Sequence, residues 1–172
     1  MERTELGREI TRVAHLTGGE FTLRSGLVTD TYFDKFRFTT DPVLLREVAA
    51  GLAGLLPADT EVLAGLELGG VPLAAALALH TGLPATYVRK ARKTYGTAKL
   101  AEGDEIGGKR VVIIEDVVTT GGQVVLSAAD LRAEGAAVTA ALCVIDRETG
   151  GAESLAEAGL ELCSLFRISD LT

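Results

Sequence analysis

The chain has 172 residues, of which 47% are hydrophobic and 24% charged, and its formal net charge at pH 7 is −7. A chain of this length can bury the core of one domain without metal ions or disulfides. Its acidity argues against a general nucleic-acid binder, because such proteins neutralise phosphates with Lys and Arg. No apolar run approaches the roughly 20 residues of a membrane-spanning helix, and the N-terminal MERTELGREI lacks the apolar stretch of a secretory signal. We therefore expect a cytoplasmic protein that binds neither nucleic acid nor membrane.

The two cysteines do not form a recognisable metal or redox motif. Cys143 and Cys163 lie in separate apolar runs, with no CxxC and no paired histidines. This pattern predicts reduced residues of the core.

The N-terminal part of the chain has the pattern of a helix followed by a hairpin. Apolar residues at helical spacing predict an amphipathic helix over residues 3–16, which Gly18 and Gly19 end. Two segments rich in β-branched and aromatic residues follow, at 21–26 and 31–36, and predict a hairpin or two short strands. Their aromatic residues suit either stacking on a flat ligand or packing within the hairpin, and the sequence leaves both open.

The remainder of the chain alternates between strand and helix patterns. Asp41 followed by Pro42 is typical of a helix start, with Asp as the N-cap. Strands are expected at 61–66, 84–88, 111–114, 137–145 and 160–166, and helices at about 70–80, 124–132 and 154–158. Such alternation predicts right-handed βαβ crossovers, hence an α/β fold whose central parallel sheet is flanked by helices. The simplest organisation is a single domain over 1–172, with residues 1–40 as a small N-terminal cap on a core over about 41–172.

The most informative stretch is 111–123, which reads VVIIEDVVTTGGQ. A β-branched run meets two carboxylates, Glu115 and Asp116, and a Thr/Gly loop then opens a helix. Glycines allow positive φ, and the first N–H groups of a helix lack internal partners, so this loop suits a phosphate. The acidic pair, expected at the end of the strand, suits sugar hydroxyls or a metal-bound ligand. The alternative is an ordinary strand-to-helix turn with solvated acids.

A basic run contrasts with the acidic remainder of the chain. Residues 89–99 contain five cations and no acid. Their poor apolar periodicity and their glycine predict a mobile loop, which we place at 91–103. A solvated basic face is the usual explanation of such a run. Here the run leaves the carboxyl end of a predicted strand, where α/β ligand sites lie, and this favours binding of a multiply charged anion.

These motifs together resemble a known enzyme family. The segment IEDVVTTGGQ is similar to the 5-phosphoribosyl-1-diphosphate (PRPP) motif of type I phosphoribosyltransferases, whereas the lysine of a Walker loop and the GxGxxG of a Rossmann fold are missing. The segments FTLRSG, TYFD, LELGGVP, YVRKARKTYGTAKLAEG and VIDRETGG occur in the order seen in orotate phosphoribosyltransferases. The resemblance implies a type I phosphoribosyltransferase fold and a pentosyltransferase that converts orotate and PRPP to orotidine 5′-monophosphate and diphosphate, in de novo pyrimidine (UMP) biosynthesis.

The resemblance also implies roles for individual residues. The residues expected to act in catalysis are Lys93, Glu115 and Asp116. Those expected to bind PRPP are Arg89, Lys90, Lys93, Tyr95, Glu115, Asp116, Val117, Val118, Thr119, Thr120, Gly121, Gly122 and Gln123. Those expected to contact orotate are Arg24, Tyr32, Phe33, Thr119 and Arg147. The family further implies Mg²⁺ held mainly through PRPP, with no direct protein ligand, and a homodimer in which the basic loop acts across the interface.

Three positions depart from better-known relatives. Arg24 replaces a frequent lysine, Gly69 stands where some relatives have lysine, and Tyr95 replaces a histidine common in the loop. A tyrosine is a poor proton donor or acceptor at neutral pH. We expect the reaction class to survive all three changes.

Two other functions are compatible with parts of the pattern. A phosphoribosyltransferase for a purine would share the PRPP motif, but the carboxylate of orotate gives Arg147 a partner that purines lack. A PRPP-sensing regulator would be expected to lose the loop lysine and to add a basic nucleic-acid-binding segment. This chain retains Lys93 and shows no such segment.

Overall fold

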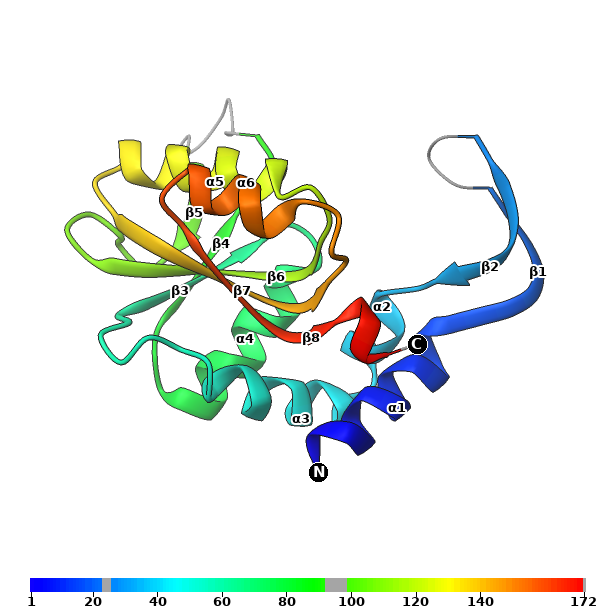
Figure 1. Cartoon of the computed structure of the whole chain (residues 1–172). Coiled ribbons are helices and arrows are strands. Elements are labelled where there is room, and N and C mark those ends of the chain that lie inside the picture. The colour runs from blue at the N-terminus through cyan, green and yellow to red at the C-terminus, as the bar shows by residue number, and fades with distance from the viewer. Residues whose placement is uncertain (23–25, 92–98, 172) are drawn as a thin grey trace.

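The structure, a computed structural model, describes residues 1–22, 26–91 and 99–171. It contains a six-stranded sheet with helices on both faces and a two-stranded hairpin that projects from one side (Figure 1). Within these ranges, no helix has the length and apolar character needed to cross a membrane.

The predicted parallel sheet is confirmed, with one addition at its edge. Its strands, in spatial order, are β5 (Ala101–Gly103), β4 (Ala85–Val88), β3 (Val62–Leu66), β6 (Arg110–Val118), β7 (Ala137–Asp146) and β8 (Glu161–Arg167). All neighbouring pairs are parallel except β4 and β5. The antiparallel β5 was not predicted, because three residues are too few to show a periodicity. It lies within the 91–103 segment that we predicted to be a loop.

Helices cover the two faces of the sheet unequally (Figure 1). On one face lie α1 (Arg3–Ala14), α3 (Pro42–Ala53) and α4 (Gly70–Thr81), and on the other lie α5 (Gly122–Ala133) and α6 (Gly151–Glu157). The central strand β6 serves both cores: Val112 and Ile114 pack on the first face, and Val111 and Ile113 on the second. This two-sided burial accounts for the uninterrupted β-branched run that the sequence shows.

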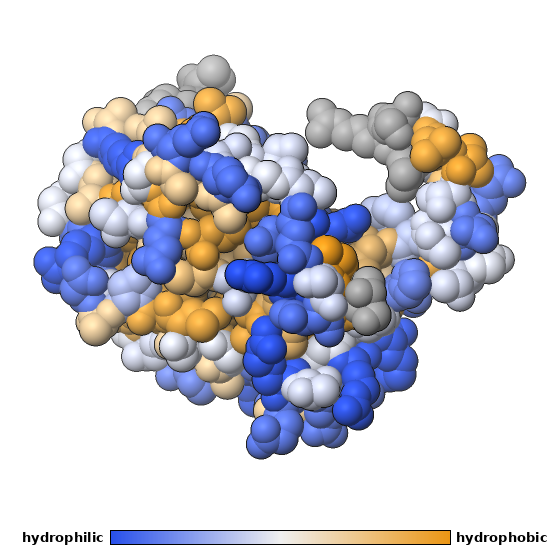
Figure 2. All heavy atoms as spheres, viewed as in Figure 1, coloured by the Kyte–Doolittle hydropathy of each residue, from blue (hydrophilic) through white to orange (hydrophobic). Residues whose placement is uncertain are grey.

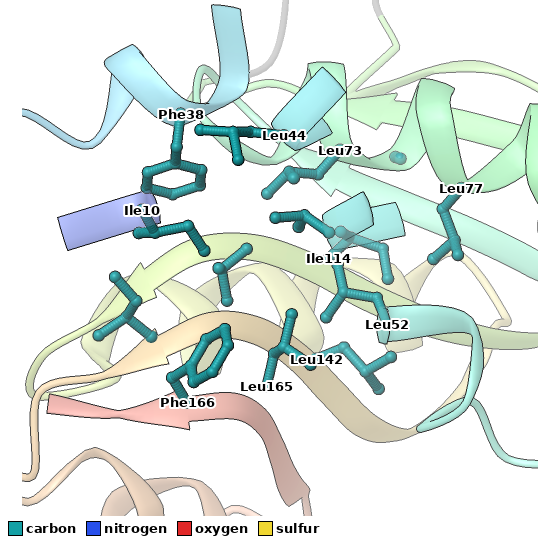
Figure 3. Packing of buried hydrophobic residues seen from close by; sticks show 14 of the residues in the cluster. Ile10, Phe38, Leu44, Leu52, Leu73, Leu77, Ile114, Leu142, Leu165 and Phe166 are labelled. Carbon is teal, nitrogen blue, oxygen red and sulfur yellow. The ribbon is translucent and has the colours of Figure 1, made fainter. Parts of the chain in front are cut away.

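The larger core joins the N-terminal segment to the sheet. Ile10 of α1 and Phe38 of α2 (Phe36–Thr40) are fully buried in it together with Ile114 and Leu142 (Figure 3). Asp41 caps α3 as expected, because its Oδ1 accepts hydrogen bonds from the backbone N–H groups of Val43 and Leu44 at 2.9 and 3.0 Å.

Two boundaries in the N-terminal segment differ from the prediction. The first helix ends at Ala14, and Gly18 and Gly19 do not end it; they lie inside β1 (His15–Thr22). The pairing of β1 with β2 (Val28–Phe33) is irregular between Thr17 and Phe21, and Gly18 has a φ of 74°, so the glycines form an irregularity in the strand. The aromatic segment predicted as a strand to residue 36 turns instead into α2, where Phe38 contacts the core.

The hairpin stands away from the body of the protein, and an open hollow separates the two in Figure 2. Leu27, just before β2, and Val28, its first residue, are 64% and 51% exposed. Across the strands, the rings of Phe21 and Tyr32 stack with their centroids 5.6 Å apart. Part of the aromatic content therefore serves packing within the hairpin.

Both cysteines are free thiols. Cys143 is buried in β7, and burial raises the pKa of its thiol; Cys163 is half-buried in β8, and burial also raises the pKa of its thiol. Neither has the low pKa of a reactive cysteine.

The packing of Phe38 gives a stability prediction. Phe38→Ala is expected to lower the free energy of unfolding by about 3–5 kcal/mol, because it leaves a cavity between the N-terminal segment and the sheet. Urea denaturation measures this change. Leu126→Ala on the outer face of α5, where the side chain is 63% exposed, is the control and should change stability by no more than about 0.5 kcal/mol. Equal effects of the two substitutions would contradict the described core.

Candidate active site

The parallel strands bring four chain segments to one edge of the sheet, the edge formed by the carboxyl ends of the strands. β3, β4, β6 and β7 all end there, so the segments that follow them lie next to one another. Two hydrogen bonds join neighbours directly: Glu67 N–H donates to Val88 O at 2.8 Å, and Arg147 N–H donates to Val118 O at 2.9 Å. The sequence motifs that were recognised separately therefore form one surface.

The Thr/Gly loop connects the end of β6 to the start of α5. Gly121 has a φ of 77° and precedes the first residue of the helix. Thr119, Thr120, Gly122 and Gln123 are exposed. Exposed hydroxyls next to the unpaired N–H groups of a helix start provide donors for a phosphate, as the sequence predicted.

The glycines of the later RETGG segment pack against this loop. A Cβ on Gly151 would lie 2.5 Å from Thr119 O, and a Cβ on Gly121 would lie 2.5 Å from Leu155 Cδ1 of α6. Larger residues at either position would push the two segments apart. The two motifs are thus parts of one packed unit, although Gly150 follows Gly121 by 29 positions in the sequence.

The acidic pair lies inside β6. The sequence predicts it at the end of that strand, but the strand continues to Val118. Asp116 is 0% exposed, and its Oδ1 accepts hydrogen bonds from Lys35 Nζ at 3.0 Å and from Val117 N–H at 2.7 Å. Its Oδ2 is buried and has no hydrogen-bond partner among the described residues. A buried carboxylate oxygen without a donor is costly, and it can accept a further hydrogen bond.

Gly69 explains part of this geometry. A Cβ at Gly69 would overlap Asp116 Oδ2, and a Cβ at Gly70 would overlap Ile114 O. The segment between β3 and α4 can therefore approach the acidic pair only because both residues are glycines. With Asp116 where it is, no side chain fits at position 69, and Lys35 is the cation that contacts Asp116.

The surroundings of Glu115 raise its pKa. Burial, followed by the charge of Asp116, raises the pKa of Glu115 to about 8, while Lys35 lowers it. Glu115 Oε1 also accepts the backbone N–H of Asp116 at 3.0 Å. At neutral pH the pair therefore holds a proton and carries less than its full charge of −2.

The described part of the basic run lies at the same edge. Arg89 Nε pairs with Glu102 Oε1 of β5 at 3.2 Å, and Lys90 N–H donates to Glu67 Oε2 at 3.0 Å, while the Lys90 side chain is exposed. Lys93 and Tyr95, predicted to bind PRPP, and Arg24, predicted to contact orotate, lie outside the described residues.

A cavity of about 370 Å³, which we call the cap cavity, lies between the N-terminal segment and the core. Its lining residues are Thr11, His15, Thr29, Thr31, Tyr32, Phe33, Arg147, Ile168 and Leu171. It brings together Tyr32, Phe33 and Arg147, which the resemblance had implied for one ligand. Thr119 does not line it; its loop is linked to Arg147 through the backbone hydrogen bond to Val118.

Sequence reasoning missed several residues of this region. Lys35 could have been noticed as a cation directly after the aromatic TYFD segment. His15, Ile168 and Leu171 gave no signal, because they are distant from every motif. Across the described ranges, no group of three or more His, Cys, Asp or Glu residues is arranged to hold a metal ion.

Comparisons with known proteins agree with this geometry. Residues 44–158 match the phosphoribosyl transferase domain model. An orotate phosphoribosyltransferase from a Nocardioides species is 53% identical over 96% of this chain and 92% of its own length, and the one from Methanocella arvoryzae is 44% identical over 98% and 96%. The crystal structure of Mycobacterium tuberculosis orotate phosphoribosyltransferase in complex with PRPP superposes with a TM-score of 0.84 at 31% identity, covering 98% of each chain. The chain belongs to the phosphoribosyltransferase family and, within it, to the orotate phosphoribosyltransferases.

Proposed function

We propose that the described edge of the sheet is where this chain carries out the family's reaction, the transfer of the 5-phosphoribosyl group from PRPP to orotate. The products are orotidine 5′-monophosphate and diphosphate, and the pathway is pyrimidine synthesis. The observation that carries the assignment is the convergence of the Thr/Gly loop, the acidic pair and the cap cavity at one edge. The similar Mycobacterium tuberculosis protein with bound PRPP supports it.

In this proposal the Thr/Gly loop binds the 5′-phosphate. The N–H groups from Val118 to Gln123 and the hydroxyls of Thr119 and Thr120 are the donors, since Val117 N–H already donates to Asp116 Oδ1. Backbone donors at a helix start hold a phosphate in a fixed place without a lysine. The ribose is thereby anchored beside the acidic pair.

The acidic pair then orients the ribose. The hydroxyls of the sugar would supply hydrogen bonds to Glu115 and to the unpartnered Oδ2 of Asp116. Lys35 holds the Asp116 carboxyl group in place through its contact with Oδ1 at 3.0 Å. Positioning of this kind suits displacement at the anomeric carbon through an oxocarbenium-like transition state, in which no covalent nucleophile is needed.

The cap cavity is the proposed orotate site. Arg147 can bind a carboxylate through two parallel hydrogen bonds, and Tyr32 and Phe33 provide flat apolar surface for the ring. Thr119 would contact the edge of the ring nearest the loop, and Arg24 is assigned to the same ligand from sequence alone.

The diphosphate is assigned to the basic run, with Arg89, Lys90, Lys93 and Tyr95 as its contacts. We propose that Mg²⁺ arrives bound mainly to PRPP, since this ion retains waters and prefers substrate phosphates with few protein ligands. Bound there, it would neutralise negative charge that grows on the leaving group. Closure of the loop would exclude water from the site.

The assembly and the cellular location are also part of the proposal. We infer a homodimer in which the basic run of one subunit completes the site of the other, as the resemblance implies. The proposed location is the cytoplasm, where thiols such as those of Cys143 and Cys163 remain reduced.

The direct test of function is a spectrophotometric assay. Purified protein mixed with PRPP, Mg²⁺ and orotate is expected to consume orotate and to release diphosphate. The consumption is measured as the loss of the absorbance of orotate. Adenine, hypoxanthine and guanine are assayed in parallel. Turnover of a purine but not of orotate would overturn the substrate assignment.

The role of the loop lysine gives a second prediction. Lys93→Ala is expected to slow the chemical step by about a hundredfold or more, because one charge aimed at the transition state is lost. PRPP binding, measured by calorimetry, should weaken far less. Lys109→Ala is the control, since Lys109 already pairs with Asp104, and should retain turnover. Unchanged turnover in Lys93→Ala would show that this lysine does not reach the reaction.

The pKa of Glu115 predicts a dependence of stability on pH. Because the folded-state pKa of about 8 lies above the value of 4.5 for a free carboxyl, folding favours the protonated form, and this contribution is lost as pH rises through the folded pKa. Glu115→Gln keeps the shape of the protonated acid and cannot ionise. The free energy of unfolding of Glu115→Gln minus that of the natural protein should therefore increase between about pH 5 and about pH 8. Thermal unfolding at several pH values measures this difference, and a difference independent of pH would contradict the raised pKa.

A further inference from the structure

The cap cavity has a wall that no motif indicated. Arg147 follows β7, whereas Ile168 and Leu171 belong to the C-terminal segment that follows β8. The two strands are neighbours, with Asp146 opposite Arg167 in the pairing. The segments that follow β7 and β8 therefore lie side by side, and residues of both line the cap cavity.

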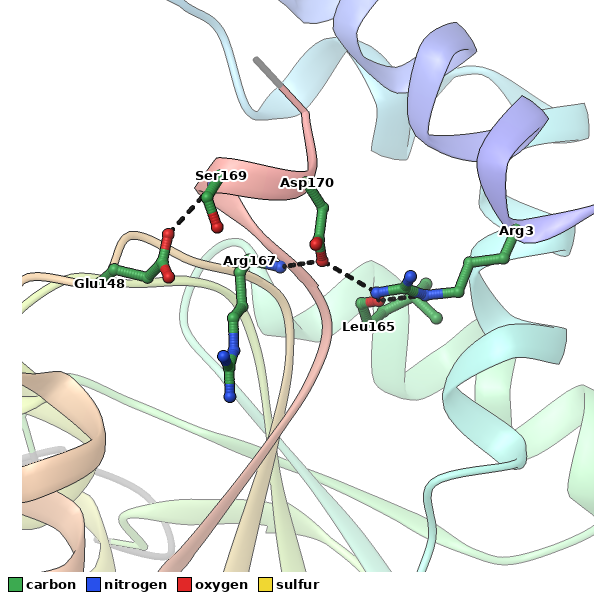
Figure 4. A network of polar contacts seen from close by, with 6 residues as sticks. All are labelled: Arg3, Glu148, Leu165, Arg167, Ser169 and Asp170. Carbon is green, nitrogen blue, oxygen red and sulfur yellow. Dashed lines mark hydrogen bonds and ion pairs between the residues drawn. The ribbon is translucent and has the colours of Figure 1, made fainter.

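Glu148 connects these two segments directly. It has a φ of 55°, a left-handed conformation that is uncommon for a residue with a side chain. Its backbone N–H donates to Oδ1 of the buried Asp146 at 2.9 Å, and its carboxylate Oε2 accepts the backbone N–H of Ser169 at 3.0 Å (Figure 4). The residue after Arg147 thus holds both the end of β7 and the C-terminal turn.

The C-terminal turn is also anchored on its other side. The 3-10 helix η1 (Ile168–Asp170) ends in Asp170, whose Oδ2 accepts hydrogen bonds from Arg167 N–H and from Arg3 Nη2, both at 2.9 Å (Figure 4). Arg3 also donates from Nε and Nη2 to Leu165 O at 3.1 and 2.9 Å. One guanidinium therefore ties the turn to β8 and to α1.

Leu171 is seated closely on α1. A Cβ at Gly7 would lie 3.0 Å from Leu171 Cδ2, and the hydroxyl of Thr11, which also lines the cavity, lies 3.0 Å from Gly7 O and 3.4 Å from Leu171 O. The C-terminal residues are therefore held from both sides, and they face the cavity that contains Arg147.

We propose that Glu148 and the C-terminal turn act together as a positioning unit, which holds the Arg147 backbone and closes the cap cavity, and so determines the affinity for the carboxylate of the pyrimidine substrate. The inference rests on the proposed function of the cavity. An arginine on a loose loop loses conformational freedom when it binds a carboxylate, whereas one on a loop held at both ends loses less. Glu148 acts through Arg147 and is not a catalytic residue.

The test compares two substitutions at Glu148, each of which must adopt the same positive φ. Glu148→Ala removes the hydrogen bond to Ser169 N–H. It is expected to raise the KM for orotate about fivefold to tenfold, because a charged hydrogen-bond acceptor is lost. Glu148→Gln retains an oxygen that accepts this bond and should stay within about twofold of the natural protein. The KM for PRPP should be unchanged in both, because the phosphate loop is not altered. A merely structural role would change both KM values or neither.

Further variants keep the test decisive. Asp170→Ala removes the second anchor and should also raise the KM for orotate selectively; it replaces Glu148→Ala if that variant does not fold. Glu9→Ala is the control, because it breaks only an exposed ion pair with Arg12 on helix α1. Its KM for orotate should match that of the natural protein. An unaltered KM for orotate in the folded Glu148→Ala and Asp170→Ala variants would overturn the inference.

Arg147→Ala separates this inference from the proposed function. If Arg147→Ala raises the KM for orotate and the anchoring variants do not, the positioning unit alone is wrong. If Arg147→Ala itself leaves the KM for orotate unaltered while the protein turns over, the cap cavity is not the orotate site and both ideas fail.

Discussion

The ion pair between Lys35 and the fully buried Asp116 is the interaction on which this site depends. A carboxyl group buried in a strand with apolar neighbours on both faces needs a counter-charge and hydrogen bonds to offset its desolvation. Lys35 supplies the charge from the N-terminal segment, at 3.0 Å, and the backbone of Val117 supplies one donor. One carboxylate oxygen still lacks a partner among the described residues. This oxygen is the acceptor that the proposed function assigns to a sugar hydroxyl.

Close backbone approaches surround this pair and explain why glycines recur in the motifs. Gly69 allows the segment after β3 to touch Asp116, and Gly151 allows the segment after β7 to touch Thr119. Each would collide with its neighbour if it carried a side chain. The glycine motifs are therefore packing surfaces that join the segments at the edge of the sheet, in addition to any contact with phosphate.

The sequence predicted the sheet and the position of the Thr/Gly loop between β6 and α5 well, because both follow from local patterns. The β-branched run of β6 and the Thr/Gly loop after it are contiguous in the chain. Where long-range contacts decide the structure, prediction failed: Gly18 and Gly19 read as a helix end but form an irregularity of β1, and the three residues of β5 become a strand only by pairing with β4. The burial of Asp116 and the presence of Ile168 in the cap cavity depend on residues far away in sequence, so no local pattern could indicate them.

In the proposed function the N-terminal segment is part of the active site, because it would contribute to two subsites at once. Tyr32 and Phe33 line the cap cavity, and Lys35, two residues later, binds Asp116 beside the phosphate loop. A short stretch of chain therefore links the surface for the base to the carboxylate for the sugar. Any displacement of this stretch changes both together, since Phe38 fixes its far end in the core. A displacement at the anomeric carbon requires that base and sugar be held in a fixed relation, and in the proposed function the short connection from Tyr32 to the buried Phe38 contributes to it.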